Sequence, residues 1–432
     1  MNRQILKLAI PNIISNITIP LIGIVDLAIV GHLGSEKYIG AIAVGGMIFS
    51  FLYWGFSFLR MGTTGFTAQS FGKKNAQESA KILGQSLIIS VLGSFLLLIL
   101  QIPIEYISFK ILSASSEVES LAREYFNIRI WAAPATIAMY ALMGWFIGMQ
   151  NTRIPMAIAL TINLLNLGFN ALFVYVFGMT SDGVALGTVI AQYLGLALSL
   201  FLLRRRYKDV FKLVTIKTVN DGKSLMKFLI VGRDIFLRTI CLLLVLSFIT
   251  AKSAKLGDTV LAVNTILLQF FTLFSYVTDG FAYAGEALSG RYIGERDKPK
   301  LSTLIKKLFT FGLITAILFS LTYIIAISDI VKLMTNESSV IKMALELKWW
   351  IVIIPIISFA SFLWDGIFVG ATESKGLRNS MFLASILFFV VYYLSINILH
   401  NNSIWLAFVI FLAARGFLQT IIFRRKILIN KI

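Results

Sequence analysis

The sequence has little charge, cysteine or histidine. Charged residues make up 14% of its 432 residues, whereas soluble domains carry roughly 25%, and this scarcity argues against an ordinary soluble domain. The single cysteine, Cys241, excludes an intrachain disulfide. Only two histidines, His32 and His400, accompany it, so we find no recognisable Cys/His metal cluster, although carboxylates alone could bind a hard cation.

Catalytic motifs are also missing. There is no G-x-x-x-x-G-K-[ST] loop, which argues against direct use of ATP. No Ser/His/Asp or Cys/His grouping supports hydrolysis. The net charge of +18 could indicate nucleic-acid binding, but basic loops of a membrane protein explain it better. We therefore expect no enzyme activity, no nucleic-acid partner and no cofactor.

Apolar stretches fill most of the chain, which is 58% hydrophobic. A membrane-spanning helix needs about 20 mostly apolar residues. The first apolar stretch is too long for a cleavable signal core and has no cleavage site after it. The sequence predicts an all-α integral membrane protein with twelve transmembrane helices, at 8–31, 39–66, 82–104, 122–148, 155–177, 184–203, 228–250, 259–284, 304–327, 343–369, 379–399 and 403–423.

Basic residues are distributed unequally between the two sets of loops. If both termini lie on one side, the segments on that side hold 26 Lys and Arg residues, and the opposite loops hold 6. Cytoplasmic loops of membrane proteins carry the excess of Lys and Arg. The bias predicts an even number of spans and two cytoplasmic termini.

The longest and most basic loop, 204–227, divides the chain into an N-terminal lobe, 1–203, and a C-terminal lobe, 228–432. Three short matches between the halves occur at spacings of 223, 222 and 219 residues. These nearly equal spacings suggest a duplication, with the lobes related by a pseudo-two-fold axis along the membrane normal. The matches are Leu33-Gly34 with Leu256-Gly257, Gly72 with Gly294, and Ala43-Val44 with Ala262-Val263.

Asp26 is an ionisable residue deep in the first apolar stretch, after Pro11 and Pro20. Prolines remove a helix hydrogen bond and permit bending. Burial disfavours the charged carboxylate, and a bound proton or cation would remove that penalty. Ion binding at Asp26 could therefore switch the preferred shape of the helix. The alternative is a structural Asp hydrogen-bonded to neighbouring Asn or Thr groups.

The stretch 155–177 carries Asn163, Asn166 and Asn170, and the last two share a helix face. Amide oxygens can ligate a hard cation or hydrogen-bond a protonated carboxyl group. Asparagines can also simply hold helices together. The spacing alone leaves both interpretations open.

The second half contains further ionisable residues in apolar surroundings. Arg238 could pair with Asp234 one turn away, and Asp279 and Glu286 lie on roughly one side of their helix. With Asp365 they predict a polar cavity in the second lobe, although structural pairing is the alternative for each. The remaining intramembrane arginines have no assigned role: Arg60, Arg129 and Arg415.

Several motifs resemble those of the MATE (multidrug and toxic compound extrusion) family, and specifically its DinF-like branch. They occur in the family's order along the whole chain: Ala9-Ile-Pro-Asn, Ile24-Val-Asp-Leu-Ala-Ile-Val-Gly-His-Leu-Gly34, Arg233-Asp-Ile-Phe-Leu-Arg-Thr239, Asp279-Gly-Phe-Ala-Tyr-Ala-Gly-Glu286 and Trp364-Asp-Gly-Ile-Phe-Val-Gly-Ala-Thr372.

The resemblance implies a two-lobed, twelve-helix antiporter driven by a proton or sodium gradient. It also implies an ion site in the first lobe at Asp26, Asn166, Asn170 and Thr188. Asn170 departs from the family pattern, because many relatives have Asp there. A cation would then meet one formal negative charge instead of two, which should weaken sodium binding at Asp26.

We therefore expect a monomeric, cation-coupled antiporter of the bacterial inner membrane that exports small amphipathic, cationic organic compounds by alternating access. One alternative is a flippase for lipid-linked precursors, which shares the wider superfamily architecture. The other is an integral-membrane enzyme, which the lack of a catalytic constellation disfavours.

Overall fold

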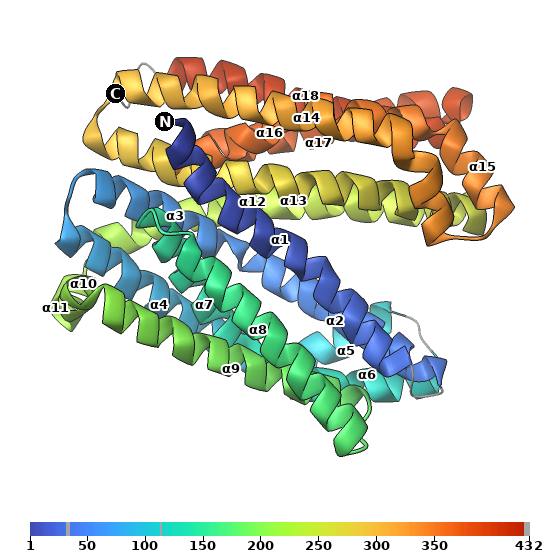
Figure 1. Ribbon diagram of the computed structural model, residues 1–432, viewed down its shortest axis with the longest axis horizontal. Coiled ribbons are helices and arrows are strands. Elements are labelled where there is room, and N and C mark those ends of the chain that lie inside the picture. Colours follow the sequence, from blue (N-terminus) through green and yellow to red (C-terminus); the bar gives the residue numbers. More distant parts are fainter. Residues whose placement is uncertain (32–34, 113–114, 427–432) are drawn as a thin grey trace. The chain divides into compact units, whose positions relative to one another are not determined.

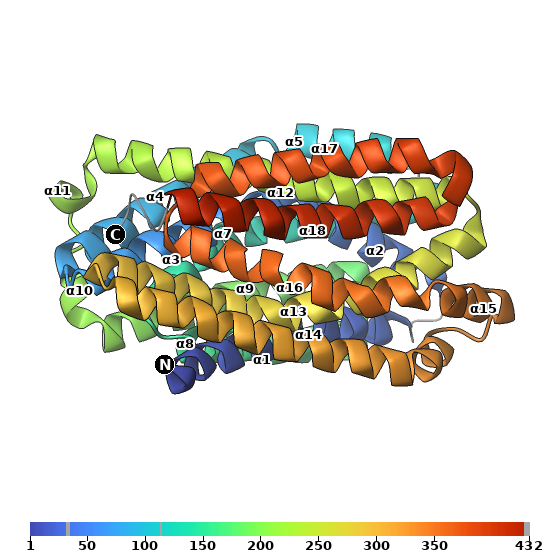
Figure 2. The same ribbon diagram turned by 90° about the horizontal axis from the view of Figure 1, so that it is seen from above.

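The computed structural model describes residues 1–31, 35–112 and 115–426, apart from the side chains of 19–28 and of residues 30 and 426. Within these residues all regular structure is helical, which confirms the predicted all-α class (Figures 1 and 2). The chain divides into two compact units, Ile14–Phe228 and Leu229–Ile432 together with Met1–Ile13. Two helices, α1 (Asn2–Gly31) and α12 (Gly222–Lys255), contribute residues to both units.

The first unit contains, besides most of α1, the helices that follow it up to the start of α12. They are α2 (Glu36–Gly55), α3 (Ser57–Gly72), α4 (Ala76–Ile99), α5 (Gln101–Ile111), α6 (Ser116–Arg129), the 3₁₀ segment η1 (Ile130–Ala132), α7 (Ala133–Gly148), α8 (Arg153–Ala171), the π-helical segment η2 (Leu172–Val176), α9 (Ser181–Arg206), α10 (Lys208–Lys212) and α11 (Ile216–Val219).

In the second unit, which α12 enters, α13 packs against α14 and α16, and α18 packs against α16 and α17 (Figure 1). These helices are α13 (Asp258–Glu295), α14 (Lys298–Met334), α15 (Ser338–Glu346), α16 (Lys348–Gly370), α17 (Ser374–Leu399) and α18 (Asn401–Lys426).

The described residues contain 10 segments that are long and apolar enough to cross a membrane. With α1 and α12, which are 30 and 34 residues long and include the predicted spans 8–31 and 228–250, they make up the expected twelve. Some predicted spans are helices in series, such as α2 with α3, which meet at Phe56. Others exceed the prediction, since α13 and α14 are 38 and 37 residues long.

Close helix packing in the two halves reveals the internal duplication. A Cβ atom added to Gly144 in α7 would collide with the carbonyl oxygen of Arg60 in α3. A Cβ atom added to Gly366 in α16 would collide in the same way with the carbonyl oxygen of Ala282 in α13. Both members of the second pair lie 222 residues after those of the first. Only glycine permits such close backbone approach.

The turns of the two halves repeat with the same spacing of 222 residues. Lys74 and Arg296 adopt left-handed backbone conformations with φ of 54° and 57°. The next residues, Asn75 and Asp297, then accept hydrogen bonds from backbone N–H groups three residues later, which caps α4 and α14. The shared geometry confirms the duplication that short sequence matches suggested.

Replacing Gly366 by Val tests the close approach of α13 and α16. The added side chain must push against the main chain of Ala282, and overpacking of this kind costs about 1–3 kcal/mol or more. We expect a clear fall in the temperature at which detergent-solubilised protein loses its monodisperse state. Gly46→Val is the control, because a Cβ atom there meets nothing within 4 Å. Equal losses in the two variants would contradict this account of the packing.

Candidate functional site

A chain of hydrogen-bonded polar side chains, buried on α8 and partly buried on α9, connects these two helices of the first unit. The side-chain amide of Asn166 donates to the hydroxyl of Thr188 at 3.0 Å. The side-chain amide of Asn170 donates to the side-chain oxygen of Asn166 at 3.2 Å. Thr188 itself donates to the backbone carbonyl of Val184 at 2.9 Å. Three of the four predicted first-lobe residues are therefore brought together.

The backbone of α9 approaches Asn170 closely at Gly187. A Cβ atom at this position would collide with the Asn170 side-chain oxygen, so a glycine is required beside it. Asn170 is fully buried, and Asn166 is 5% exposed. Gly187 is part of the site that sequence reasoning missed, because an isolated glycine in an apolar helix gives no signal of what it contacts.

Helix α8 also forms hydrogen bonds with α1. The amide of Asn163 donates to the hydroxyl of Thr18 at 3.0 Å, and the hydroxyl of Tyr175 donates to the backbone carbonyl of Ile29 at 3.2 Å. Asn163 thus contacts α1 while its neighbours Asn166 and Asn170 contact α9 or each other. The asparagines of α8 therefore form hydrogen bonds with two neighbouring helices, α1 and α9.

The predicted coupling residue and one of the predicted bending prolines lie outside the described side chains. Asp26 and Pro20 are both in the stretch of α1 for which only the backbone helix is described. Pro11 is buried, and α1 continues as one helix through both prolines. Coupling at Asp26 and bending at Pro11 and Pro20 stay predictions.

Asp365 in α16 is the centre of a buried charge cluster in the second unit. Its Oδ2 atom accepts hydrogen bonds from Arg238 of α12 and from Arg415 of α18, the latter at 2.8 Å. Its Oδ1 atom accepts one from the amide of Gln419 at 2.6 Å. Asp279 of α13 is near enough to act electrostatically on Arg415. Both oxygens of Asp365 are therefore occupied by donors of this chain.

Asp234 belongs to a separate cluster near the start of α17. Its carboxylate accepts from Arg378 at 2.8 Å and from the Ser374 hydroxyl at 2.9 Å, and exposed Arg233 lies 3.3 Å away. The suggested pairing of Arg238 with Asp234 is wrong, because Arg238 binds Asp365 instead. Arg238 and Asp234 thus both find their partners on other helices.

Glu286 is buried on α13 beside the α16 backbone, where Gly370 faces its carbonyl oxygen. Asp279, seven residues earlier, is only partly buried. The residues predicted to line one second-lobe cavity thus occur in different surroundings. Sequence reasoning left Arg415 unassigned and missed Gln419, Ser374 and Arg378, because hydrophilic residues on other helices reveal their partners only after folding.

Comparison with known proteins identifies the family. The MatE family model matches residues 11–172 and 235–394 of this chain. The chain belongs to the MatE family. The DNA damage-inducible protein F of Escherichia coli (strain K12) is 38% identical over 98% of this chain and 92% of its own length. A probable multidrug resistance protein NorM of Photorhabdus laumondii is 24% identical over 87% of this chain and 83% of its own length.

Solved structures show the same fold for this MatE protein. An outward-facing multidrug resistance MATE transporter of the MOP superfamily superposes with a TM-score of 0.89, covering 98% of this chain and 95% of its own, at 18% identity. The Vibrio cholerae MATE transporter VcmN in its bent form superposes with a TM-score of 0.88 at 19% identity, covering 98% of this chain and 96% of its own. Its membership of the MatE family and its membrane-spanning helices make this protein a multi-pass membrane transporter, and the resemblance drawn from its motifs is confirmed.

The buried cluster around Asp365 predicts a large cost for losing one arginine. Arg415→Met removes a cation that is 2% exposed and leaves carboxylates with less compensation, which costs about 3–5 kcal/mol for a buried pair. We expect a marked loss of resistance to thermal unfolding in detergent. Arg233→Met is the matched control, since its side chain is 59% exposed and such pairs contribute about 0–1 kcal/mol. A tolerated Arg415→Met would show that the cluster is not needed for stability.

Proposed function

We propose that this protein is a cation-coupled antiporter that exports small amphipathic, cationic organic compounds by alternating access. Membership of the MatE family and the names of relatives as multidrug resistance proteins support export of such compounds. Its bacterial relatives support a place in the inner membrane. The uneven loop charges support cytoplasmic termini.

The observation that carries the coupling proposal is the hydrogen-bonded chain of Asn166, Asn170 and Thr188. These residues place amide and hydroxyl oxygens on two packed helices of the same half as Asp26. Such oxygens are suitable ligands for hard cations. Asparagine and threonine carry no formal charge, so the negative charge that the ion neutralises is assigned to Asp26. A proton needs only that carboxylate, whereas sodium would also need the neutral oxygens.

The second half supports this choice by contrast. The carboxylate oxygens of Asp365 already accept from two arginines and a glutamine. Asp234 likewise accepts from Arg378 and Ser374. A cation arriving at either carboxylate would meet fixed positive charge, which Coulomb repulsion opposes. We therefore assign coupling to the first half and a structural role to these two acids.

Coupling requires that ion and substrate bind the two conformations of the transporter with different affinities. Protonation or cation binding at Asp26 removes the cost of a buried charge and so favours one arrangement of α1. Substrate then leaves in the arrangement that the ion stabilises. The family assignment does not favour the rival role of a lipid-linked precursor flippase.

The decisive experiment is Asp26→Asn in proteoliposomes, with proton and sodium gradients imposed separately. Asparagine has a similar shape but cannot exchange a proton, so we expect gradient-driven efflux to fall to the level of empty vesicles. Asp258→Asn is the control, because Asp258 is an exposed residue in the first turn of α13. Undiminished efflux from folded Asp26→Asn protein would refute the assignment, and cation-independent flipping of labelled lipid would favour the flippase.

Thr188→Val tests the neutral part of the site. Valine keeps the branched shape but removes the oxygen that accepts from Asn166, and an unpaired buried donor costs about 1–3 kcal/mol. We expect the apparent affinity for sodium, which needs these neutral oxygens, to weaken about ten-fold, since 1.4 kcal/mol corresponds to that factor. Binding of a proton at Asp26 alone should change little. Thr188→Ser retains the hydroxyl and should transport nearly normally. An unchanged sodium dependence in Thr188→Val would remove Thr188 from the site.

A further inference from the structure

The segment between α9 and α12 has two different faces. Its inner face is apolar, and Tyr207, Val210 and Val214 pack against the cluster of buried residues around Trp145. Val219 lies against Gly84 of α4, where an added Cβ atom would collide with the valine side chain. The segment is therefore a folded element of the first unit, not a loose tether.

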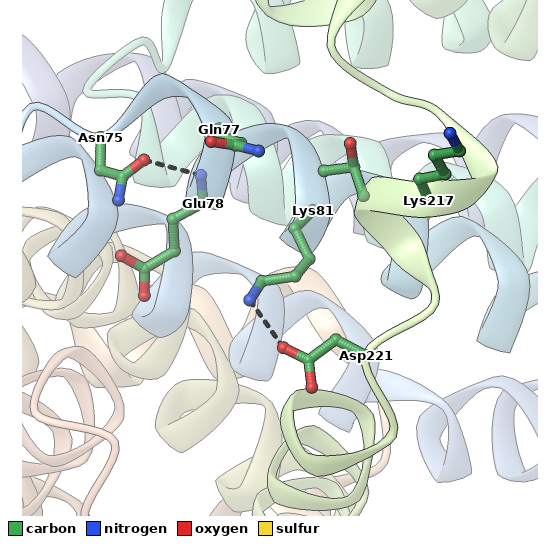
Figure 3. Close-up of a pocket in the computed structure, with 7 residues that line it drawn as sticks. Asn75, Gln77, Glu78, Lys81, Lys217 and Asp221 are labelled. Carbon is green, nitrogen blue, oxygen red and sulfur yellow. Dashed lines mark hydrogen bonds and ion pairs between the residues drawn. The ribbon is translucent and has the colours of Figure 1, made fainter.

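Polar contacts fasten the same segment to α4. Lys81 forms an ion pair with Asp221 at 2.9 Å (Figure 3). Gln85 donates to the backbone carbonyls of Val219 and Asp221 at 3.2 Å each. Asp221 also accepts from the backbone N–H of Ser224 at 3.1 Å, which caps the start of α12. Its hydrogen bond from Lys81 lowers the pKa of the Asp221 carboxyl group, so the pair persists at neutral pH.

The outer face combines exposed apolar side chains with lysines. Ile216 is 89% exposed, and Phe211 and Leu213 are 38% and 39% exposed. Lys208, Lys212 and Lys217 alternate with them and form no ion pair within the described part of the chain. Lys217 extends away from the Lys81–Asp221 pair (Figure 3). Leaving so much of an isoleucine side chain in water costs free energy, so we expect this face to contact an apolar environment.

The surroundings of this outer face are set by connectivity. The segment starts where the membrane-spanning α9 ends, at Arg206, and continues into α12, so it lies at a membrane–water interface. Residues 204–227 contain eight basic and two acidic residues, and Lys81 neutralises one of the acids. An excess of lysine and arginine attracts anionic lipid, and apolar side chains beside it enter the headgroup layer.

We propose that residues 208–217 form a docking surface for the anionic phospholipid headgroups of the membrane that this protein spans. Lys208, Lys212 and Lys217 bind the lipid phosphates, while Phe211, Leu213 and Ile216 enter the boundary between headgroups and acyl chains. The contacts of Lys81 and Gln85 with the segment hold this surface in place. A soluble anion would satisfy the lysines but would leave the apolar side chains in water.

The test uses a spin label at residue 216 of the full chain. Cys241 is first replaced by Ser, so that Ile216→Cys provides a single labelling site. The protein is placed in nanodiscs of phosphatidylcholine alone or with added phosphatidylglycerol. The measurement is the ratio of label collisions with oxygen, which partitions into lipid, to collisions with a water-soluble nickel chelate. We expect phosphatidylglycerol to raise this ratio, and 1 M salt to reverse the rise.

Charge variants supply the controls. The triple variant Lys208→Gln, Lys212→Gln, Lys217→Gln should lose the response to phosphatidylglycerol, since each lysine strengthens attraction to an anionic surface about five-fold. The matched variant removes three other exposed lysines and should keep the response: Lys298→Gln, Lys306→Gln, Lys307→Gln. A label at Leu333→Cys, a site that is 87% exposed with one nearby lysine, should respond little.

Three outcomes would overturn the proposal. One is a ratio at residue 216 that does not change with lipid composition. Another is an equal response in the triple lysine variant, which would remove the lysines from the interaction. The third is a change produced by inorganic phosphate in pure phosphatidylcholine nanodiscs, which would assign the lysines to a soluble anion instead.

Discussion

The free-energy cost of burying a polar group away from water is the constraint on which the arrangement of polar residues in this protein depends. In the hydrocarbon layer no solvent can satisfy a hydrogen-bonding group, so backbone groups are paired within helices and polar side chains must find partners across them. Asp365 shows the effect, because two arginines and a glutamine from two other helices converge on one carboxylate. The amides of Asn166 and Asn170 show it without formal charge.

The duplication explains how one architecture carries two kinds of polar chemistry. The glycine contacts between α3 and α7 recur between α13 and α16, and so do the left-handed turns and helix caps that precede α4 and α14. These repeated features involve main-chain geometry, which tolerates few substitutions. The intramembrane side chains are free of that constraint. The first half holds an uncharged chain of amides, whereas the second half holds compensated ion pairs.

The two helices that connect the halves, α1 and α12, make different kinds of contact. Helices α1 and α12 each contribute residues to both compact units. On α1, Thr18 accepts from Asn163 within the first unit, while Gly280 of the second unit packs against Ile13. The start of α12 is tied to α4 by way of Asp221 and Gln85. Helix α1 therefore packs within the second unit through its first residues and within the first unit through the rest.

The sequence by itself determined the number of spans and the family, because these follow from hydrophobicity and motifs that act over local stretches. It also brought Asn166, Asn170 and Thr188 forward, through the family resemblance. Only the tertiary structure decided that Arg238 and Arg415 bind Asp365, that Arg378 binds Asp234, and that Gly187 lies against Asn170. Such partners are far apart in the chain, and the packing of helices, not their local pattern, chooses among them.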